Sequence, residues 1–300
     1  MELSTIFNNV EFYAPTHTYK HKLSGEVFTS VTQLIARYKN PFDPTGAIAK
    51  AIAKRDDSTV EEVQAKWKAK SKEALTLGNR IHSLFENHIK GDTQTDMWIK
   101  PFEYALEKIG CSMELEGIRF YPEFLVYDED NKVAGTVDLL IHLPNNEYII
   151  VDYKTNAVFK HPDDEADYVK PMKSPFMELK DCNYNHYTLQ LNAYRNMLVK
   201  KGVNVTAMYI FHINRDIKDV DIHQINYTSL GNVLLTGNLC FGTELAAVPV
   251  PQIPESEPKP TVSILNTLVD VAVTVGEINR YEATLIKKYI KFLKQDKVKA

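Results

Sequence analysis

The sequence predicts an α/β fold in which helices flank a mixed central sheet. Three strand-like runs follow one another at about residues 117–127, 133–143 and 147–154, and helical patterns precede and follow them. A further apolar run, "VTAMYIFHIN", comes after the second helical pattern and is typical of a buried strand. This order of helix, three strands, helix and strand favours an α/β sandwich around a mixed sheet.

The segment before the strands is predicted to be helical over residues 36–110, after about 35 residues of short strands or loops. Asp43 and Pro44 form a suitable N-cap and first-turn pair for a helix that continues over "TGAIAKAIAKR". Ser58 and Glu61 have the spacing of a capping box and predict the start of another helix.

Three further elements follow from periodicity and from helix stop signals. In "GNRIHSLFENHIK" the apolar residues fall on one side, as in an amphipathic helix. The next helix is predicted from about Pro101 to Ile109, where Gly110 ends it. After the strands, residues 156–182 form a long irregular stretch, which in a compact domain is usually functional or disordered. "YTLQLNAYRNMLVKK" is then predicted to be a helix that Gly202 ends.

The chain divides into a main domain, a linker and an appendage. With 300 residues, of which 44% are hydrophobic and 25% charged, it is long enough for a sizeable core in one large domain or two. The main domain is predicted over residues 1–245. Residues 246–262 are rich in proline and predict a semi-extended linker, and residues 263–300 predict a small helical appendage.

Composition excludes several classes of protein. No apolar run approaches the ~18 residues of a membrane span, and the N-terminus lacks the basic start and apolar core of a secretory signal. The three cysteines are far apart, so they fit neither a disulfide framework nor a zinc or iron–sulfur pattern, and a reducing cytoplasm is the expected compartment. The net charge of −4 argues against binding nucleic acid by bulk electrostatics, although a local groove is compatible with it.

One predicted hairpin, "GTVDLLIHLPNNEYIIVDYKT", carries two carboxylates that we expect to face each other. If the three residues 144–146 form the loop, Leu143 pairs with Glu147, and the same register places Asp138 opposite Asp152. Lys154 then lies on the same face as Asp152. Opposed like charges are destabilising, so the pair is either a solvated edge, neutralised in part by the lysine, or a site for a divalent cation.

Two further patterns carry polar residues at one-turn helical spacing. Gly78, His82 and Glu86 form a G-x-x-x-H-x-x-x-E pattern in the helix upstream of the strands. Gln190 and Tyr194 form a Q-x-x-x-Y pattern in the helix downstream, where this spacing places both side chains on one face.

Together with the D…D-x-K pattern of the hairpin, these elements resemble the PD-(D/E)XK nuclease superfamily and its RecB-like exonuclease branch. The resemblance covers roughly residues 75–215, and it is greatest to the stand-alone exonucleases of phages and mitochondria, including "SVTQLI" near the N-terminus. It implies a restriction-endonuclease-like core of order α-β-β-β-α-β with N-terminal helical additions. The chain lacks the four clustered cysteines of the iron–sulfur members and any phosphate loop of a helicase motor.

The resemblance also implies roles for individual residues. Asp138, Asp152 and the main-chain carbonyl of Tyr153 are the expected metal ligands, and Lys154 is expected to position the attacking water. His82 is expected to contribute to the metal site, although a lone helical histidine is ordinarily a satisfied surface or core residue. Two acids each have two interpretations. Glu123 is either a metal-site carboxylate or an ordinary strand acid, and Glu86 either positions the histidine or is an exposed helix charge.

Contacts with nucleic acid are expected from two places. Gln190 and Tyr194 are expected to contact the scissile phosphate or to order the water, the alternative being a tyrosine packed in the core with a glutamine at its rim. The segment 156–182 interleaves cations with aromatic rings, which suits a single strand as well as it suits a plain surface loop. The cations considered are Lys160, Lys170, Lys173 and Lys180, and the rings are Phe159, Tyr168 and Phe176.

The activity that the resemblance implies is Mg²⁺-dependent DNA exonuclease activity on single strands or strand ends, with Mn²⁺ as a substitute metal and no iron–sulfur cluster. DNA is the expected partner, together with a recombinase or single-strand-binding protein, in recombination, repair or phage genome processing in a bacterial host. The alternatives are a structure-specific endonuclease and a catalytically inactive DNA-end-binding subunit of a recombination complex.

Overall fold

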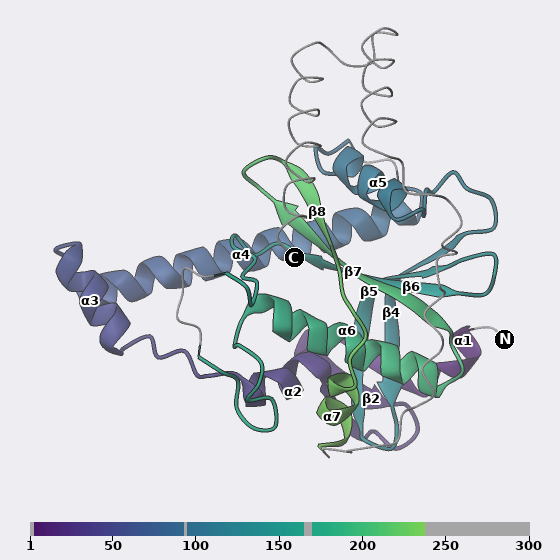
Figure 1. The fold of residues 1–300 in the computed structure, drawn as a ribbon, viewed down its shortest axis with the longest axis horizontal. Helices are drawn as coiled ribbons and strands as arrows, with labels where there is room; N and C mark the ends of the chain where they lie inside the picture. Colours follow the sequence, from purple (N-terminus) through teal and green to yellow (C-terminus); the bar gives the residue numbers. More distant parts are fainter. Residues whose placement is uncertain (1–2, 93–94, 165–169, 238–300) are drawn as a thin grey trace, which may run out of the picture. The chain divides into compact units, whose positions relative to one another are not determined.

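The computed structural model describes residues 3–92, 95–164 and 170–237 (Figure 1). The predicted linker over 246–262, the predicted helix over 263–300 and Cys240 lie outside the described residues. Among the described residues, no helix combines the length and the apolar character that crossing a bilayer requires.

The described strands form one mixed sheet of eight strands, which agrees with the predicted fold class. The strands are β1 (Val10–Tyr13), β2 (Thr18–His21), β3 (Val27–Ser30), β4 (Arg119–Asp128), β5 (Val133–His142), β6 (Tyr148–Lys154), β7 (Val205–Asn214) and β8 (Asp219–Gln224). Their order across the sheet is β1-β2-β3-β5-β6-β7-β8, and β4 pairs with β5 outside that path. The β3–β5 and β6–β7 pairs are parallel and the others are antiparallel.

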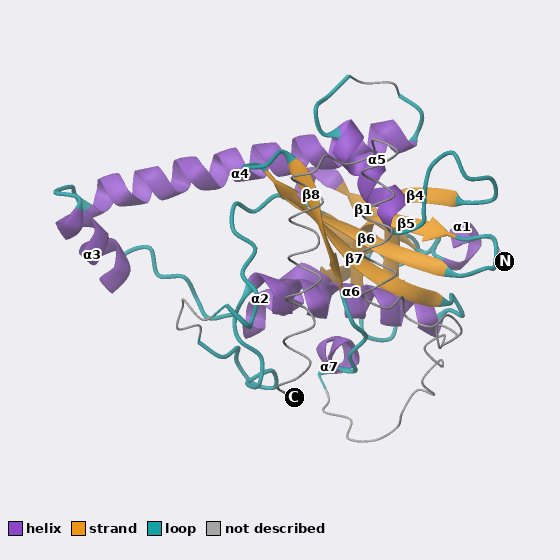
Figure 2. Cartoon of the chain, turned by 45° about the horizontal axis from the view of Figure 1, so that its top comes forward, coloured by secondary structure: helices purple, strands orange, loops and turns teal. Residues whose placement is uncertain are grey.

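Helices cover both faces of this sheet (Figure 2). One face packs against α1 (Leu3–Ile6), α2 (Val31–Tyr38) and α6 (Asn183–Lys200), and α7 (Leu230–Thr236) packs on α6 and α2. The other face packs against α5 (Ile99–Lys108) and the C-terminal part of α4 (Val60–Ile89). A 3₁₀ turn, η1 (Ala14–Thr16), joins β1 to β2, and α3 (Ala47–Arg55) precedes α4.

The N-terminal helices differ from the prediction at their starts. Helix α2 begins five residues before the predicted residue 36, because Ser30 and Gln33 form a reciprocal capping box. The predicted box at Ser58 and Glu61 is wrong by one residue, because the side chains of Thr59 and Glu62 make the two capping hydrogen bonds.

Two further expectations for this region are corrected. Helix α3 begins after Gly46, and Asp43 instead accepts hydrogen bonds from the N–H and hydroxyl of Thr45 in the preceding turn. The patterns on either side of Gly78, which we expected to be separate helices, are one continuous helix of 30 residues. A glycine within a helix interior costs about 1 kcal/mol and does not by itself end the helix.

The hairpin has the predicted register. Leu139 pairs with Val151 and His142 with Tyr148, and the N–H of Leu143 donates to the carbonyl of Glu147 across the loop. The β5–β6 ladder ends at the Leu139–Val151 pair, one position before Asp138 and Asp152.

Strand β5 changes partner at this point. Strand β4 runs along one edge of β5 from Val133 to His142. Strand β6 pairs with the other edge only at residues 139–142, and β3 pairs with β5 at Val133 and Ala134. A strand has two edges, so β3 and β6 share the second edge and leave a fork in the sheet at residues 135–138.

Tyr194 of α6 packs against the backbone of this fork. A Cβ atom on Gly135 would lie 2.4 Å from Cε1 of Tyr194, so only glycine leaves room for the ring. Tyr194 is 3% exposed and belongs to the core on that face, so the ring has little freedom to move.

We predict that Gly135→Ala lowers the free energy of unfolding by about 1–3 kcal/mol, because the added methyl group overpacks the core. Chemical denaturation of the wild type, Gly135→Ala, Tyr194→Leu and the double variant gives the coupling energy. The cost of Gly135→Ala should be much smaller when Tyr194 is already Leu. An equal cost in both backgrounds would show that the ring is not the constraint.

Candidate metal centre

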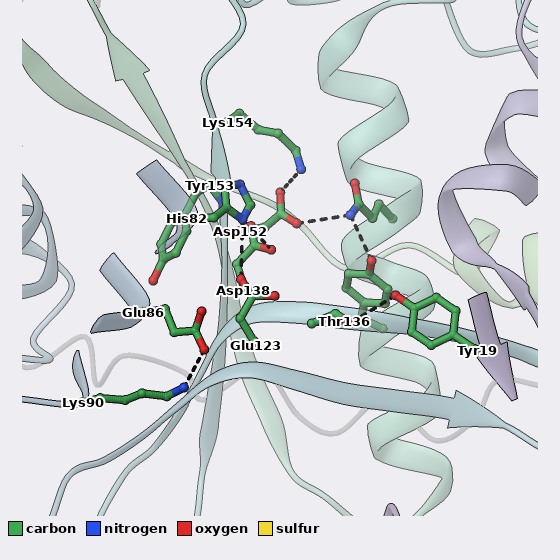
Figure 3. A network of polar contacts seen from close by, with 12 residues as sticks. Tyr19, His82, Glu86, Lys90, Glu123, Thr136, Asp138, Asp152, Tyr153 and Lys154 are labelled. Carbon is green, nitrogen blue, oxygen red and sulfur yellow. Dashed lines mark hydrogen bonds and ion pairs between the residues drawn. The ribbon is translucent and has the colours of Figure 1, made fainter. Parts of the chain in front are cut away.

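Three carboxylates lie in a row across β4, β5 and β6 at the fork. In the β4–β5 register, Pro122 pairs with Leu139 and Phe124 with Val137, so Glu123 lies opposite Asp138. Glu123 has a φ of 50°, a left-handed conformation that interrupts the strand at this position. On the other side, the β5–β6 register places Asp152 opposite Asp138. The β4–β5 ladder lacks the Glu123–Asp138 pair and the β5–β6 ladder ends before Asp138 and Asp152, whereas Asp152 keeps its pairing with Ile210 of β7. The three carboxylates gather at one place (Figure 3).

Helix α4 brings His82 to two of these carboxylates. His82 Nδ1 lies 3.5 Å from Asp138 Oδ1 and 3.6 Å from Glu123 Oε1. Ligand atoms of these three residues all lie within 4.8 Å of one another, close enough for one metal ion to bind them together. One turn before His82, a Cβ atom on Gly78 would lie 3.3 Å from Oγ1 of Thr155, so the glycine allows α4 to pass close to the end of β6.

The pKa values of the site follow from burial and from the opposing charges. Burial alone would lower the pKa of His82, but the carboxylates of Asp138 and Glu123 raise it to about 9. Burial raises the pKa of Asp138, and it raises that of Asp152 to about 6 although Lys154 opposes the shift. With His82 and Lys154 protonated and the three acids ionised, the site keeps one net negative charge.

Asp152 is held from the side of α6. Lys154 forms an ion pair with Asp152 Oδ2, as expected for two residues on the same face of β6. Gln190 Nε2 donates to Asp152 Oδ1 at 3.2 Å and to the hydroxyl of Tyr194 at 3.0 Å. Gln190 and Tyr194 are therefore adjacent as predicted, but here Gln190 contacts the carboxylate, whereas Tyr194 contacts Gln190 and lies in the core.

Tyr153 links the two faces of the site. Its N–H donates to Asp138 Oδ2 at 2.6 Å, which fixes the carboxylate between the diverging strands. Its ring packs on the opposite face of the sheet against His82, Phe85 and Phe102. The predicted role of its carbonyl as a metal ligand stays a prediction.

Several predicted contacts are not formed or are different. Glu86 forms an ion pair with Lys90 at 2.5 Å on its own helix, and no contact between Glu86 and His82 is observed. Phe176 is 1% exposed and packs against Tyr38, so the expectation that bases stack on it is wrong. Phe176 is a core residue because its segment folds back over the end of α2. The sequence of the segment gave no indication of this packing.

The other described residues of the segment 156–182 differ in their burial and packing. Phe159 packs on His223 with ring centroids 4.2 Å apart. Lys170 and Lys173 are exposed, and Lys160 is partly buried. Tyr168 lies outside the described residues, so its part in the predicted strand contact stays a prediction.

Two aromatic residues of the site were not identified from the sequence. Tyr19 of β2 shares a hydrogen bond of 3.0 Å with the hydroxyl of Thr136 on the fork (Figure 3). Tyr187 of α6 places its ring 4.7 Å from Lys154 Nζ, and its hydroxyl donates to Asn156 Oδ1 at 3.0 Å. Tyr187 precedes Gln190 by one turn, a signal that helical spacing offered; no local pattern indicates Tyr19.

Comparisons with known proteins bear on the fold only weakly. No protein-family model matches the chain, and no curated protein matches it. Among solved structures, one described only as SSO0001 is 14% identical, covers 68% of this chain and 70% of its own, and has a TM-score of 0.32. A "Putative exonuclease" from Eubacterium rectale is 17% identical, covers 55% of this chain and 64% of its own, and has a TM-score of 0.33. Neither likeness is close enough to assign a function.

We predict that Mn²⁺ binds to this centre and raises the melting temperature. A ligand at 100 times its dissociation constant adds about 2.7 kcal/mol to the stability of the folded state. Calorimetric titration should show weaker binding for Glu123→Gln and Asp138→Asn. Glu114→Gln, an exposed acid outside the site, is the control and should bind as the wild type does. Equal affinity in all four proteins would exclude these ligands.

Without metal, we predict that Asp152→Asn destabilises the fold, by on the order of 3 kcal/mol, because it leaves the ammonium group of Lys154 without its carboxylate. Repulsion between Asp138 and Asp152 alone would give the opposite sign. Thermal denaturation in EDTA measures the effect. Asp152→Asn combined with Lys154→Met should recover most of the loss; if the double variant is less stable than Asp152→Asn, the ion pair does not determine the effect.

Proposed function

We propose that this protein is a metal-dependent DNA exonuclease that hydrolyses phosphodiester bonds on single strands or at strand ends. One observation carries the proposal: three carboxylates, a histidine and a lysine converge at an interrupted part of the sheet. The RecB-like sequence patterns support the same activity. They predict the residue types at these positions independently of the coordinates.

The residues fit a divalent cation. Asp138 and Glu123 offer hard oxygen ligands and His82 offers a nitrogen, and Asp152 lies opposite Asp138 in the hairpin register. The net charge argues for the same ligand, because a divalent cation bound with neutral His82 and charged Lys154 leaves the site neutral. A bound Mg²⁺ or Mn²⁺ would polarise a phosphoryl oxygen and lower the pKa of a bound water.

The other side chains of the site have different proposed roles. Lys154 is held between Asp152 and the ring of Tyr187, where its ammonium group positions the attacking water and stabilises negative charge on the phosphoryl group. Gln190, supported by Tyr194, orients Asp152. These contacts support a role for both residues in positioning the carboxylate.

DNA is the substrate that the sequence resemblance favours, in recombination, repair or phage genome processing beside a recombinase or single-strand-binding protein. A structure-specific endonuclease would use the same centre. An inactive end-binding subunit is disfavoured, because such a subunit has no need for the Asp152–Lys154 ion pair beside an Asp138 that the Tyr153 N–H holds in place.

End-labelled single-stranded, duplex and covalently closed circular DNA, each with Mg²⁺, Mn²⁺ or EDTA, test the proposal. We predict release of labelled product from linear DNA only with metal, and no cleavage of the circle. Cleavage of the circle would favour the endonuclease. Absence of cleavage on every substrate, in a protein that binds Mn²⁺, would favour the inactive subunit.

Lys154→Met should lower the rate at least ~10²-fold, the effect of removing one group that stabilises a transition state. Affinity for Mn²⁺ should persist, because an ammonium group is not a ligand. The matched control is Lys132→Met, whose lysine forms an exposed ion pair with Glu26. A Lys154→Met rate that returns to the wild-type value at saturating metal would make Lys154 structural.

A further inference from the structure

Helix α4 extends beyond the sheet, and within the described part of the chain its first half packs mainly on α3 and on the segment before α3 (Figure 1). Most residues of α4 from Ala65 to Arg80 are exposed, whereas Ile81, Leu84 and Phe85 are buried. A helix segment without an apolar face in the core gains little stability from packing, so its role lies on its surface.

This exposed part of α4 is basic in a chain of net charge −4. Between residues 66 and 80 it carries five cations and one acid, Glu73. The cations are Lys66, Lys68, Lys70, Lys72 and Arg80. An acidic partner is therefore favoured. The chain's own C-terminal residues 285–300 do not meet this requirement, because they carry six lysines.

An aromatic pair lies beside these cations. Phe42, in the segment before α3, is 67% exposed and meets Trp67 of α4 edge-on, with ring centroids 5.2 Å apart. The loop places an exposed ring next to an indole that is itself only partly buried. Exposed aromatic rings among cations are the combination that binds a single strand, since rings stack on bases while cations meet phosphates.

The pair lies on the helix face that leads to the metal centre. Trp67, Gly78 and His82 are separated by 11 and 4 residues, which places all three on one side of α4. Lys68 and Lys70 flank that side on its two edges. Fifteen residues separate Trp67 from His82, or about 22 Å along the helix axis.

We propose that Phe42, Trp67, Lys68 and Lys70 form a binding site for single-stranded nucleic acid that holds the strand about 22 Å from the metal centre. This inference rests on the proposed nuclease function, for which it names a second contact with substrate. The ligand is single-stranded because the faces of paired bases are stacked inside a duplex, where Phe42 and Trp67 have no access to them.

Tryptophan fluorescence tests the site directly. The chain has two tryptophans, and Trp98 is 5% exposed, so a change on adding oligothymidylate of about 16 nucleotides reports on Trp67. The titration is done in EDTA with the full chain. We expect saturable quenching that Trp67→Phe abolishes. A duplex of the same length and polyglutamate should not quench.

Two variants measure the contributions of stacking and charge. Phe42→Ala, at an exposed loop position, should weaken binding about 5- to 150-fold and leave the circular dichroism spectrum unchanged. Lys68→Ala with Lys70→Ala should reduce the slope of log K against log salt concentration by about 1.4, at about 0.7 per phosphate contact. Lys22→Ala with Lys100→Ala, two exposed lysines elsewhere, is the control and should keep the wild-type slope.

The outcomes separate this site from the proposed nuclease activity. Metal-dependent cleavage without a Trp67 response, or equal quenching by duplex or polyglutamate, overturns the binding site and leaves the nuclease in place. Wild-type affinity in Phe42→Ala, or equal slopes in the two lysine pairs, overturns it as well. A Trp67 response without cleavage of any DNA overturns the nuclease proposal and keeps the binding site.

Discussion

The hydrogen bond from the Tyr153 N–H to the Asp138 carboxylate is the contact on which the site depends. The β5–β6 ladder ends at the Leu139–Val151 pair, and beyond it this hydrogen bond from the backbone of β6 to the Asp138 side chain connects the two diverging strands. Because it fixes one oxygen of Asp138, the other oxygen is directed to His82. The separation of the strands also makes room for α6, whose Gln190 reaches Asp152 from the opposite face.

The electrostatics of the site follow from this geometry. Three acids in a partly desolvated place repel one another, and the fold offsets this repulsion with a protonated histidine and a partly buried lysine. A metal ion bound as proposed would compete with His82 for the carboxylates of Asp138 and Glu123. Its binding would be coupled to the loss of a proton from His82, so its affinity would rise with pH in the range where that histidine is charged.

The sequence predicts the local parts of this arrangement better than the distant ones. Alternation and a three-residue loop were sufficient for the register that brings Asp138 and Asp152 together, and helical spacing placed Gln190 beside Tyr194. Helix starts were less certain, because Ser58 and Thr59 each have a glutamate three residues later and only the fold shows which one caps. The Ser30–Gln33 box was a usable signal for α2. The fork was not predictable, because β3 reaches β5 across more than a hundred residues and no local pattern encodes that pairing.

The pairing of β3 with β5 has a consequence for how the protein folds. Thr29 meets Val133 and Tyr19 meets Thr136, so contacts of very long sequence separation border the site. Such contacts form late, since a long loop must close before they contribute, whereas the β5–β6 hairpin closes over three residues and forms early. The hairpin with Asp138 and Asp152 therefore forms before the first thirty residues dock beside these two acids. The site residues therefore converge only in the fully folded protein, and a partly folded chain has the same residues without this geometry.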